Sequence, residues 1–261
     1  MMTGLSLGKV FGVKIELHWS TLLIVFLVAQ GVMEGFIPMR HPGISFAANI
    51  CVALVTSVLF ITSILAHELA HARIGQMYGI RFQGITLFAL GGMAKMNSKI
   101  PSAKSEFWMA LAGPASSIII GLICLALYFP DNGRQSIMYT SNSSILIAYS
   151  YFATVMMYIG FINVMLGIFN GCIPAFPLDS GRILRSIIWG ITKNYKLATL
   201  WCANIGKIFA GVFAFIGILM TIGINIPFFG TGIVGGIWMF VIALFLFGAT
   251  TAEIMAVKKD V

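Results

Sequence analysis

The chain has 261 residues, of which 59% are hydrophobic and 9% charged, and its mean hydropathy is +0.97. Soluble domains carry about 25% charged residues, so this composition excludes an ordinary soluble protein and indicates a chain that crosses a membrane several times. The net charge of +8 would suggest nucleic-acid binding in a soluble protein, but here the basic residues lie between apolar segments, where membrane topology accounts for them and no nucleic-acid partner is expected.

Six apolar segments are long enough to cross a bilayer, which takes about 20 residues in a helix. They run from Trp19 to Ile37, Phe46 to Tyr78, Glu106 to Phe129, Ser144 to Cys172, Leu197 to Ile224 and Thr231 to Ala256. We therefore expect an all-α polytopic membrane protein with six transmembrane helices, forming a single integral-membrane domain over residues 1–261.

The basic residues predict the orientation of these helices. Thirteen of the 16 lysines and arginines lie before the first span, between the cores of the second and third, between the fourth and fifth, or after the sixth. Arg40 and Arg134 lie on the other side, and Lys207 lies within the fifth span. The positive-inside rule then places both termini in the cytoplasm and makes the second and fourth spans end at the cytoplasmic face.

Residues 81–96, RFQGITLFALGGMAKM, are apolar but too short to span a membrane. The Gly91-Gly92 pair interrupts this segment as a turn would. We expect a short membrane-associated β-hairpin or re-entrant loop between the second and third helices.

The stretch HELAH near the end of the second span contains His67, Glu68 and His71. Two histidines four residues apart point to one side of a helix and can chelate one Zn²⁺. Glu68 is close enough to reach a metal-activated water and act as a general base. A chance match is the alternative, but it would leave three ionisable groups in a membrane helix without a role, at a cost of a few kcal/mol each near the bilayer centre.

Catalytic zinc usually has three protein ligands and one open position. Asp179, in the PLDSG stretch after the fourth span, falls at the same predicted membrane depth as HELAH. Its alternative role is to cap the helix predicted over the following residues. The other candidate ligands are His18, Glu106 and Glu253.

HELAH in one span and FNGCIPAFPLDSGRIL after another resemble the site-2 protease family of intramembrane zinc metalloproteases, peptidase family M50, as do GVKIELHWS, LGGMAKM and LAGPASSIIIG. Ser180 stands where many relatives have glycine. The resemblance implies one Zn²⁺ per chain, with the residue roles that follow. Zinc ligands would be His67, His71 and Asp179; Glu68 would be the catalytic base; and Asn170, Gly91 and Gly92 would bind the substrate.

The resemblance further implies a zinc metalloendopeptidase that cleaves transmembrane proteins near the cytoplasmic side of a prokaryotic cell membrane, as in regulated intramembrane proteolysis. Its partners would be such a substrate and the lipid bilayer, with self-association left open. Some members of the family carry a C-terminal CBS-type regulatory domain, which is absent from this chain. A metal transporter and an inactive scaffold of the same fold are the alternatives, although the residues that catalysis would need are all present.

Overall fold

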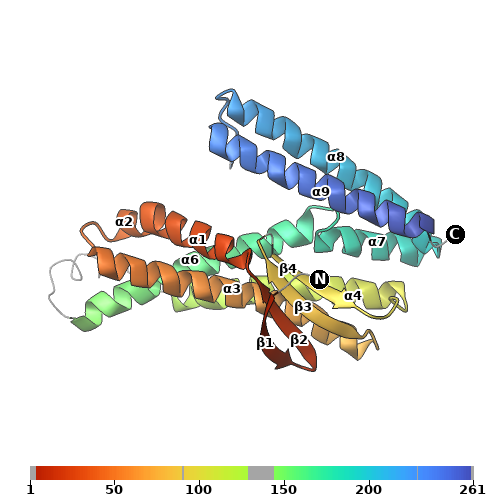
Figure 1. The fold of residues 1–261 in the computed structure, drawn as a ribbon, viewed down its shortest axis with the longest axis horizontal. Helices are drawn as coiled ribbons and strands as arrows, with labels where there is room; N and C mark the ends of the chain where they lie inside the picture. The colour runs from red at the N-terminus through yellow and green to blue at the C-terminus, as the bar shows by residue number, and fades with distance from the viewer. Residues whose placement is uncertain (1–3, 90, 129–143, 228, 260–261) are drawn as a thin grey trace. The chain divides into compact units, whose positions relative to one another are not determined.

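A computed structural model describes residues 4–89, 91–128, 144–227 and 229–259 (Figure 1). Six helical segments in this part of the chain are long and apolar enough to cross a membrane, which confirms the predicted number of spans. The first segment consists of α1 (Thr21–Gly31), a π-helical turn η1 (Val32–Phe36) and α2 (Ile37–Arg40). The others are α3 (Phe46–Met77), α4 (Ala103–Leu127), α6 (Ser144–Cys172), α8 (Tyr195–Thr221) and α9 (Ile233–Lys259). The protein is therefore an integral, multi-pass membrane protein.

The chain folds as two compact units. The first comprises Met1–Lys99 and Ala112–Ile168, and the second comprises Ile100–Leu111 and Phe169–Val261. The helices α4 and α6 each begin in one unit and end in the other. HELAH consequently belongs to the first unit, and the PLDSG stretch belongs to the second.

The first unit contains a four-stranded sheet in the order β1-β2-β3-β4. Its strands are β1 (Gly4–Val10), β2 (Val13–His18), β3 (Phe82–Phe88) and β4 (Gly91–Met96). The antiparallel pair β3–β4 confirms the predicted hairpin. The β1–β2 hairpin was not predicted. Its two-residue turn, Phe11 and Gly12, has φ of 51° and 77°, the positive values that suit the twist of a tight hairpin.

One face of this sheet packs against the part of α3 that carries HELAH. Val13 and Ile15 of β2 and Ile85 and Leu87 of β3 form one buried cluster with Ile64 and Ala72 of α3. β2 pairs with β3 in parallel, and two of the six candidate membrane spans, the α1–α2 segment and α3, lie between these strands in the chain. The sheet is thus held beside the candidate metal ligands by apolar burial.

The second unit contains α7 (Asp179–Thr192), α8 and α9, together with the first turns of α4 and the end of α6. α8 and α9 lie side by side (Figure 1) and share a buried apolar core. Asn194 caps α8, with its Oδ1 accepting a hydrogen bond from Leu197 N at 2.9 Å. A second cluster, made by Phe176, Cys202 and Ala203, packs on Leu184 and Ile188 of α7 and on Ile254 of α9.

Candidate metal centre

His67 and His71 lie one turn apart in α3 and present their rings to the same side of the helix. Their Nε2 atoms are 3.1 Å apart, and both side chains are buried. Glu68 follows His67 directly and is half-buried. The spacing in the sequence therefore gives the convergence of imidazole nitrogens that it predicts.

The helix α4 packs against the rings of the two histidines. Ser117, which is fully buried, lies with Oγ 2.9 Å from His67 Nδ1. When Nε2 binds a metal, Nδ1 carries the ring proton and donates a hydrogen bond to this hydroxyl group. The hydrogen bond fixes the tautomer and the orientation of the ring. Ser117 was not among the predicted site residues. A serine in an apolar helix, close to a Gly-Pro pair, could have indicated a polar contact at this position.

Gly113, one turn before Ser117, lets α4 approach the imidazoles closely. A Cβ atom built on Gly113 would lie 2.1 Å from His71 Nε2 and 2.6 Å from His67 Nε2. Any side chain at this position would overlap the ring nitrogens that face a metal. Gly113 thus keeps open the space in front of both histidines.

The β4 strand lies beside Glu68. A Cβ atom on Gly92 would lie 2.3 Å from Glu68 Cγ and 2.8 Å from Glu68 Oε1. Gly91, the first residue of β4, has φ of 128°, a conformation that side chains other than glycine's rarely adopt. The structure therefore brings together five of the predicted site residues, which all belong to the first unit: His67, Glu68, His71, Gly91 and Gly92.

Asn170 and Asp179 lie in the second unit. Asn170 is in the last turn of α6 and is half-buried. Asp179 is the first residue of α7, and Leu178 occupies the N-cap position. The alternative that Asp179 is the N-cap is therefore wrong, because the helix begins one residue earlier than a cap at this position would require.

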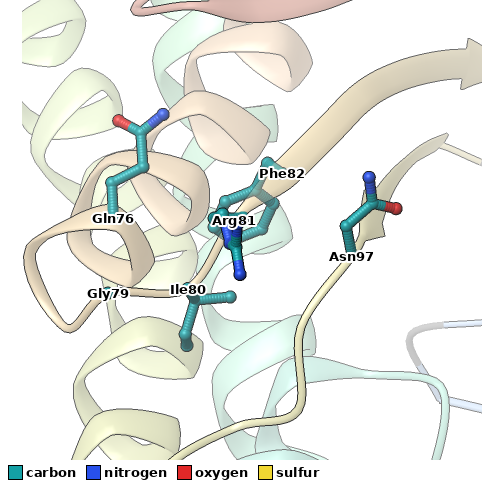
Figure 2. Close-up of a pocket in the computed structure, with 6 residues that line it drawn as sticks. All are labelled: Gln76, Gly79, Ile80, Arg81, Phe82 and Asn97. Carbon is teal, nitrogen blue, oxygen red and sulfur yellow. The ribbon is translucent and has the colours of Figure 1, made fainter.

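A separate pocket of about 660 Å³ opens at the end of α3 (Figure 2). Its lining comprises Gln76, Gly79, Ile80, Arg81, Phe82 and Asn97. Gln76 extends from the last turn of α3, and Asn97 follows β4. None of these residues belongs to the predicted site, so this pocket is not the metal centre.

The model of Peptidase family M50 matches residues 55–213, more than half of the chain. The chain belongs to this family. A zinc metalloprotease of Methanocaldococcus jannaschii is 32% identical over 225 residues, which are 84% of this chain and 55% of that protein. Rip3 of Mycobacterium tuberculosis is 28% identical over 253 residues, which are 97% of this chain and 59% of Rip3.

A solved structure from the same family, the site-2 protease of Methanocaldococcus jannaschii, has a similar fold. The TM-score is 0.58 at 27% identity, and the match covers 97% of this chain and 95% of that chain. The chain spans only 55–59% of the length of the curated relatives that it matches. The M50 fold, six membrane helices with a small sheet, is thus established for this chain.

The other candidate ligands in this M50 chain have partners of their own. Glu106 is fully buried and accepts a hydrogen bond from Arg185 Nε at 2.9 Å, while Glu253 accepts one from Arg185 Nη1 at 3.2 Å. His18 Nδ1 lies 2.7 Å from Ser20 Oγ. Charges at helix ends are ordinarily solvated, but Glu106 is buried at the start of α4, and Arg185 compensates its charge.

Arg185 itself was counted only among the basic residues of a cytoplasmic loop, yet its side chain is 3% exposed. Burial acts to lower the pKa of its guanidinium, but Glu106, Tyr195 and Glu253 together outweigh this effect, so the pKa is raised above its usual value. The guanidinium is therefore charged at every physiological pH. The ion pair spans 79 residues of sequence, and no local pattern indicates such a distant partner.

Proposed function

We propose that this chain is the membrane domain of a zinc metalloendopeptidase that hydrolyses peptide bonds of transmembrane substrates near the cytoplasmic side. The observation that carries the proposal is the 3.1 Å approach of His67 Nε2 and His71 Nε2, with Glu68 adjacent in the same helix. Membership of family M50 and the names of the curated relatives, which are names of zinc metalloproteases, support the same activity.

The donor set fits zinc. Two nitrogen ligands of a tetrahedral zinc, each about 2.0–2.1 Å from the metal, lie roughly 3.3 Å apart. The observed separation of the two Nε2 atoms is 3.1 Å. The hydroxyl group of Ser117 on the far nitrogen of His67 is the outer-sphere partner that metal-binding histidines usually have.

Zinc bound here supplies a Lewis acid that lowers the pKa of water to about 7 and polarises the peptide carbonyl. Glu68 takes the proton from the attacking water and returns it to the nitrogen of the leaving amine. The amide of Asn170 donates a hydrogen bond to the carbonyl oxygen as negative charge develops on it. Gly92 leaves room for the Glu68 side chain beside β4.

Asp179 supplies the third zinc ligand. Its carboxylate is a ligand type that catalytic zinc commonly has beside two histidines. The acidic alternatives, Glu106 and Glu253, are bound to Arg185. Asp179 stands in the first turn of α7, where backbone N–H groups stabilise a negative charge by about 0.3–1 kcal/mol.

The substrate binds as an extended strand along β4. β4 is at one edge of the sheet, so its outer side offers backbone groups for pairing. A helical peptide bond is closed to attack, and strand addition both opens it and brings it to Glu68. On this edge, Gly92 lies against the Glu68 side chain, and Gly91 directly precedes it in β4.

Both termini and the active site face the cytoplasm of a prokaryotic cell, in line with the distribution of lysines and arginines between the spans. The activity is that of regulated intramembrane proteolysis, and the cleaved fragment is released on the cytoplasmic side. Each chain holds one zinc ion.

Substitution of Asp179→Asn tests the ligand set. The amide keeps the shape of the side chain but removes its charge, so we expect zinc affinity to fall by more than the 10- to 100-fold that loss of an outer-sphere partner costs. The zinc dissociation constant of the purified full chain, measured by competition with a chelator, gives the result. Helical content measured by circular dichroism reports whether the variant is folded.

Glu34→Gln is the matched control, because Glu34 is an exposed acid in η1. The control should bind zinc like wild type. A folded Asp179→Asn variant with the same zinc affinity as the control would remove Asp179 from the ligand set.

A further inference from the structure

Arg185 is the buried centre of a side-chain cluster in the second unit, with two carboxylates and two aromatic rings around its guanidinium. Glu106 Oε1 accepts hydrogen bonds from Nε and Nη2, and Glu253 Oε2 accepts one from Nη1. The rings of Phe176 and Tyr195 each lie 4.9 Å from Cζ, measured to the ring centroid. We refer to these five residues as the Arg185 cluster.

The geometry of the cluster depends on arginine in particular. A planar guanidinium can bind a carboxylate along an edge and stack on aromatic rings at the same time, whereas a lysine ammonium cannot. The partners come from four different segments: the first turn of α4, the loop before α7, the start of α8 and the end of α9. One side chain on α7 therefore contacts four other segments of the second unit.

The loop that leads into Asp179 is tightly held through Phe176. Phe176 is 1% exposed, and its carbonyl oxygen accepts a hydrogen bond from Thr250 Oγ1 at 3.3 Å. A Cβ atom on Gly181 would lie 2.9 Å from Phe176 N, so the loop and the first turn of α7 are in direct contact. Ser180 Oγ also donates to the carbonyl oxygen of Ile173 across the loop.

Asp179 lies between the two members of the cluster that are nearest in sequence. It is three residues after Phe176 and six residues before Arg185, and the stack of Arg185 on Phe176 joins the two sides of this segment. The serine that replaces the usual glycine of the family motif adds a further hydrogen bond within the same segment. These contacts therefore lie on both sides of Asp179 along the chain.

The helix α4 connects this cluster to the histidines. Glu106 is in the first turn of α4, and Gly113, which contacts both imidazoles, lies seven residues later in the same helix. Seven residues of helix correspond to about 10 Å along its axis. The same helix thus carries the carboxylate that binds Arg185, in the second unit, and the glycine that packs on His67 and His71, in the first unit.

We propose that Arg185 is a positioning residue for the metal centre, which holds the loop before α7 and the first turn of α7 so that the Asp179 carboxylate keeps the orientation in which it ligates zinc. The proposal rests on the proposed function, because it assumes that Asp179 ligates zinc. A cluster that only stabilised the fold would change unfolding and leave zinc affinity unaltered. A positioning role changes the metal site while the fold persists.

Substitution of Arg185→Gln in the full chain separates these two roles. We expect a folded variant whose zinc affinity is lower by about 10- to 100-fold, the range for loss of an outer-sphere partner. The visible absorption of the Co²⁺-loaded protein, which depends on ligand number and geometry, should change in intensity and position. Arg185→Lys should restore the charge but not the stacking, and so recover only part of the affinity.

Arg182→Gln is the matched control, since Arg182 lies on the same helix, carries the same charge and is half-exposed. The control should show wild-type zinc affinity and a wild-type Co²⁺ spectrum. If Arg185→Gln fails to fold, Phe176→Leu provides the test, because it removes the ring from the stack and leaves both ion pairs in place. Zinc affinity should then fall in Phe176→Leu.

A folded Arg185→Gln or Phe176→Leu variant with the zinc affinity and Co²⁺ spectrum of the Arg182→Gln control would overturn the proposal. Asp179→Asn, measured in parallel, distinguishes this outcome from a failure of the proposed function. If Asp179→Asn lowers zinc affinity and the Arg185 variants do not, only the positioning role is wrong. If Asp179→Asn has no effect, the ligand set itself is wrong.

Discussion

Glu68→Gln is expected to abolish cleavage while zinc stays bound. Glutamine is isosteric with glutamate but cannot accept a proton from water, and general acid–base catalysis contributes roughly 10²- to 10⁴-fold to a rate. The fall should appear in kcat with little change in KM, because the proton is transferred in the transition state and not in substrate binding. Cleavage rates of single-span reporter proteins in proteoliposomes, at several substrate concentrations, give kcat and KM. The zinc content of the same preparations shows whether the metal stays bound.

Zinc content is the internal control of this experiment, since His67 and His71 are unaltered and Glu68 is not one of the proposed ligands. About one zinc per chain is expected in wild type and in Glu68→Gln. Cleavage that survives the substitution would rule out Glu68 as the base. Loss of zinc in the variant would instead make Glu68 part of the ligand set.

Gly113→Ala is expected to destroy zinc binding, although it adds only one methyl group. The new Cβ atom would lie 2.1 Å from His71 Nε2, far inside van der Waals contact, and 2.6 Å from His67 Nε2. Either the imidazoles or α4 must move. Both movements separate His67 and His71 from α4, which carries the Ser117 hydroxyl group that orients His67. We expect a loss in zinc affinity larger than the 10- to 100-fold typical of an outer-sphere change.

Gly211→Ala is the matched control for this substitution. Gly211 is also within a membrane helix, α8, and a Cβ atom there would meet nothing within 4 Å. This control should bind zinc normally and gain up to about 1 kcal/mol in helix stability from the better propensity of alanine. Equal zinc affinity in the two alanine variants would show that α4 does not pack on the imidazoles as the structure has it.

Hydropathy and charge were sufficient to predict the helical part of the fold. Six spans follow from apolar length, and their ends differ from the structure by only a few residues, because hydropathy does not register polar turns such as the start of α4 before Glu106. The β1–β2 hairpin was missed. Leu5 and Leu7 alternate with Gly4, Ser6 and Gly8, which is only a weak strand pattern. β2 also pairs with β3, about 70 residues further along the chain, and no local pattern indicates that pairing.

The candidate site also has one part that the sequence predicts and another part that depends on how the helices pack. His67, Glu68 and His71 are neighbours within one helix, so their spacing alone predicts that the two rings converge. The contributions of Gly113 and Ser117 depend on how α4 packs against α3, which sequence spacing does not contain. Glu106 was listed as a candidate ligand for the same reason, since its pairing with Arg185 in a different helix has no local signal in the sequence.

X-ray absorption at the zinc K-edge, on the full chain loaded with one equivalent of zinc, tests the central claim most directly. The account predicts two imidazole nitrogens about 2.0–2.1 Å from the metal and oxygen atoms as the remaining ligands. A spectrum that lacked imidazole scattering, or that showed sulfur ligands, would contradict it.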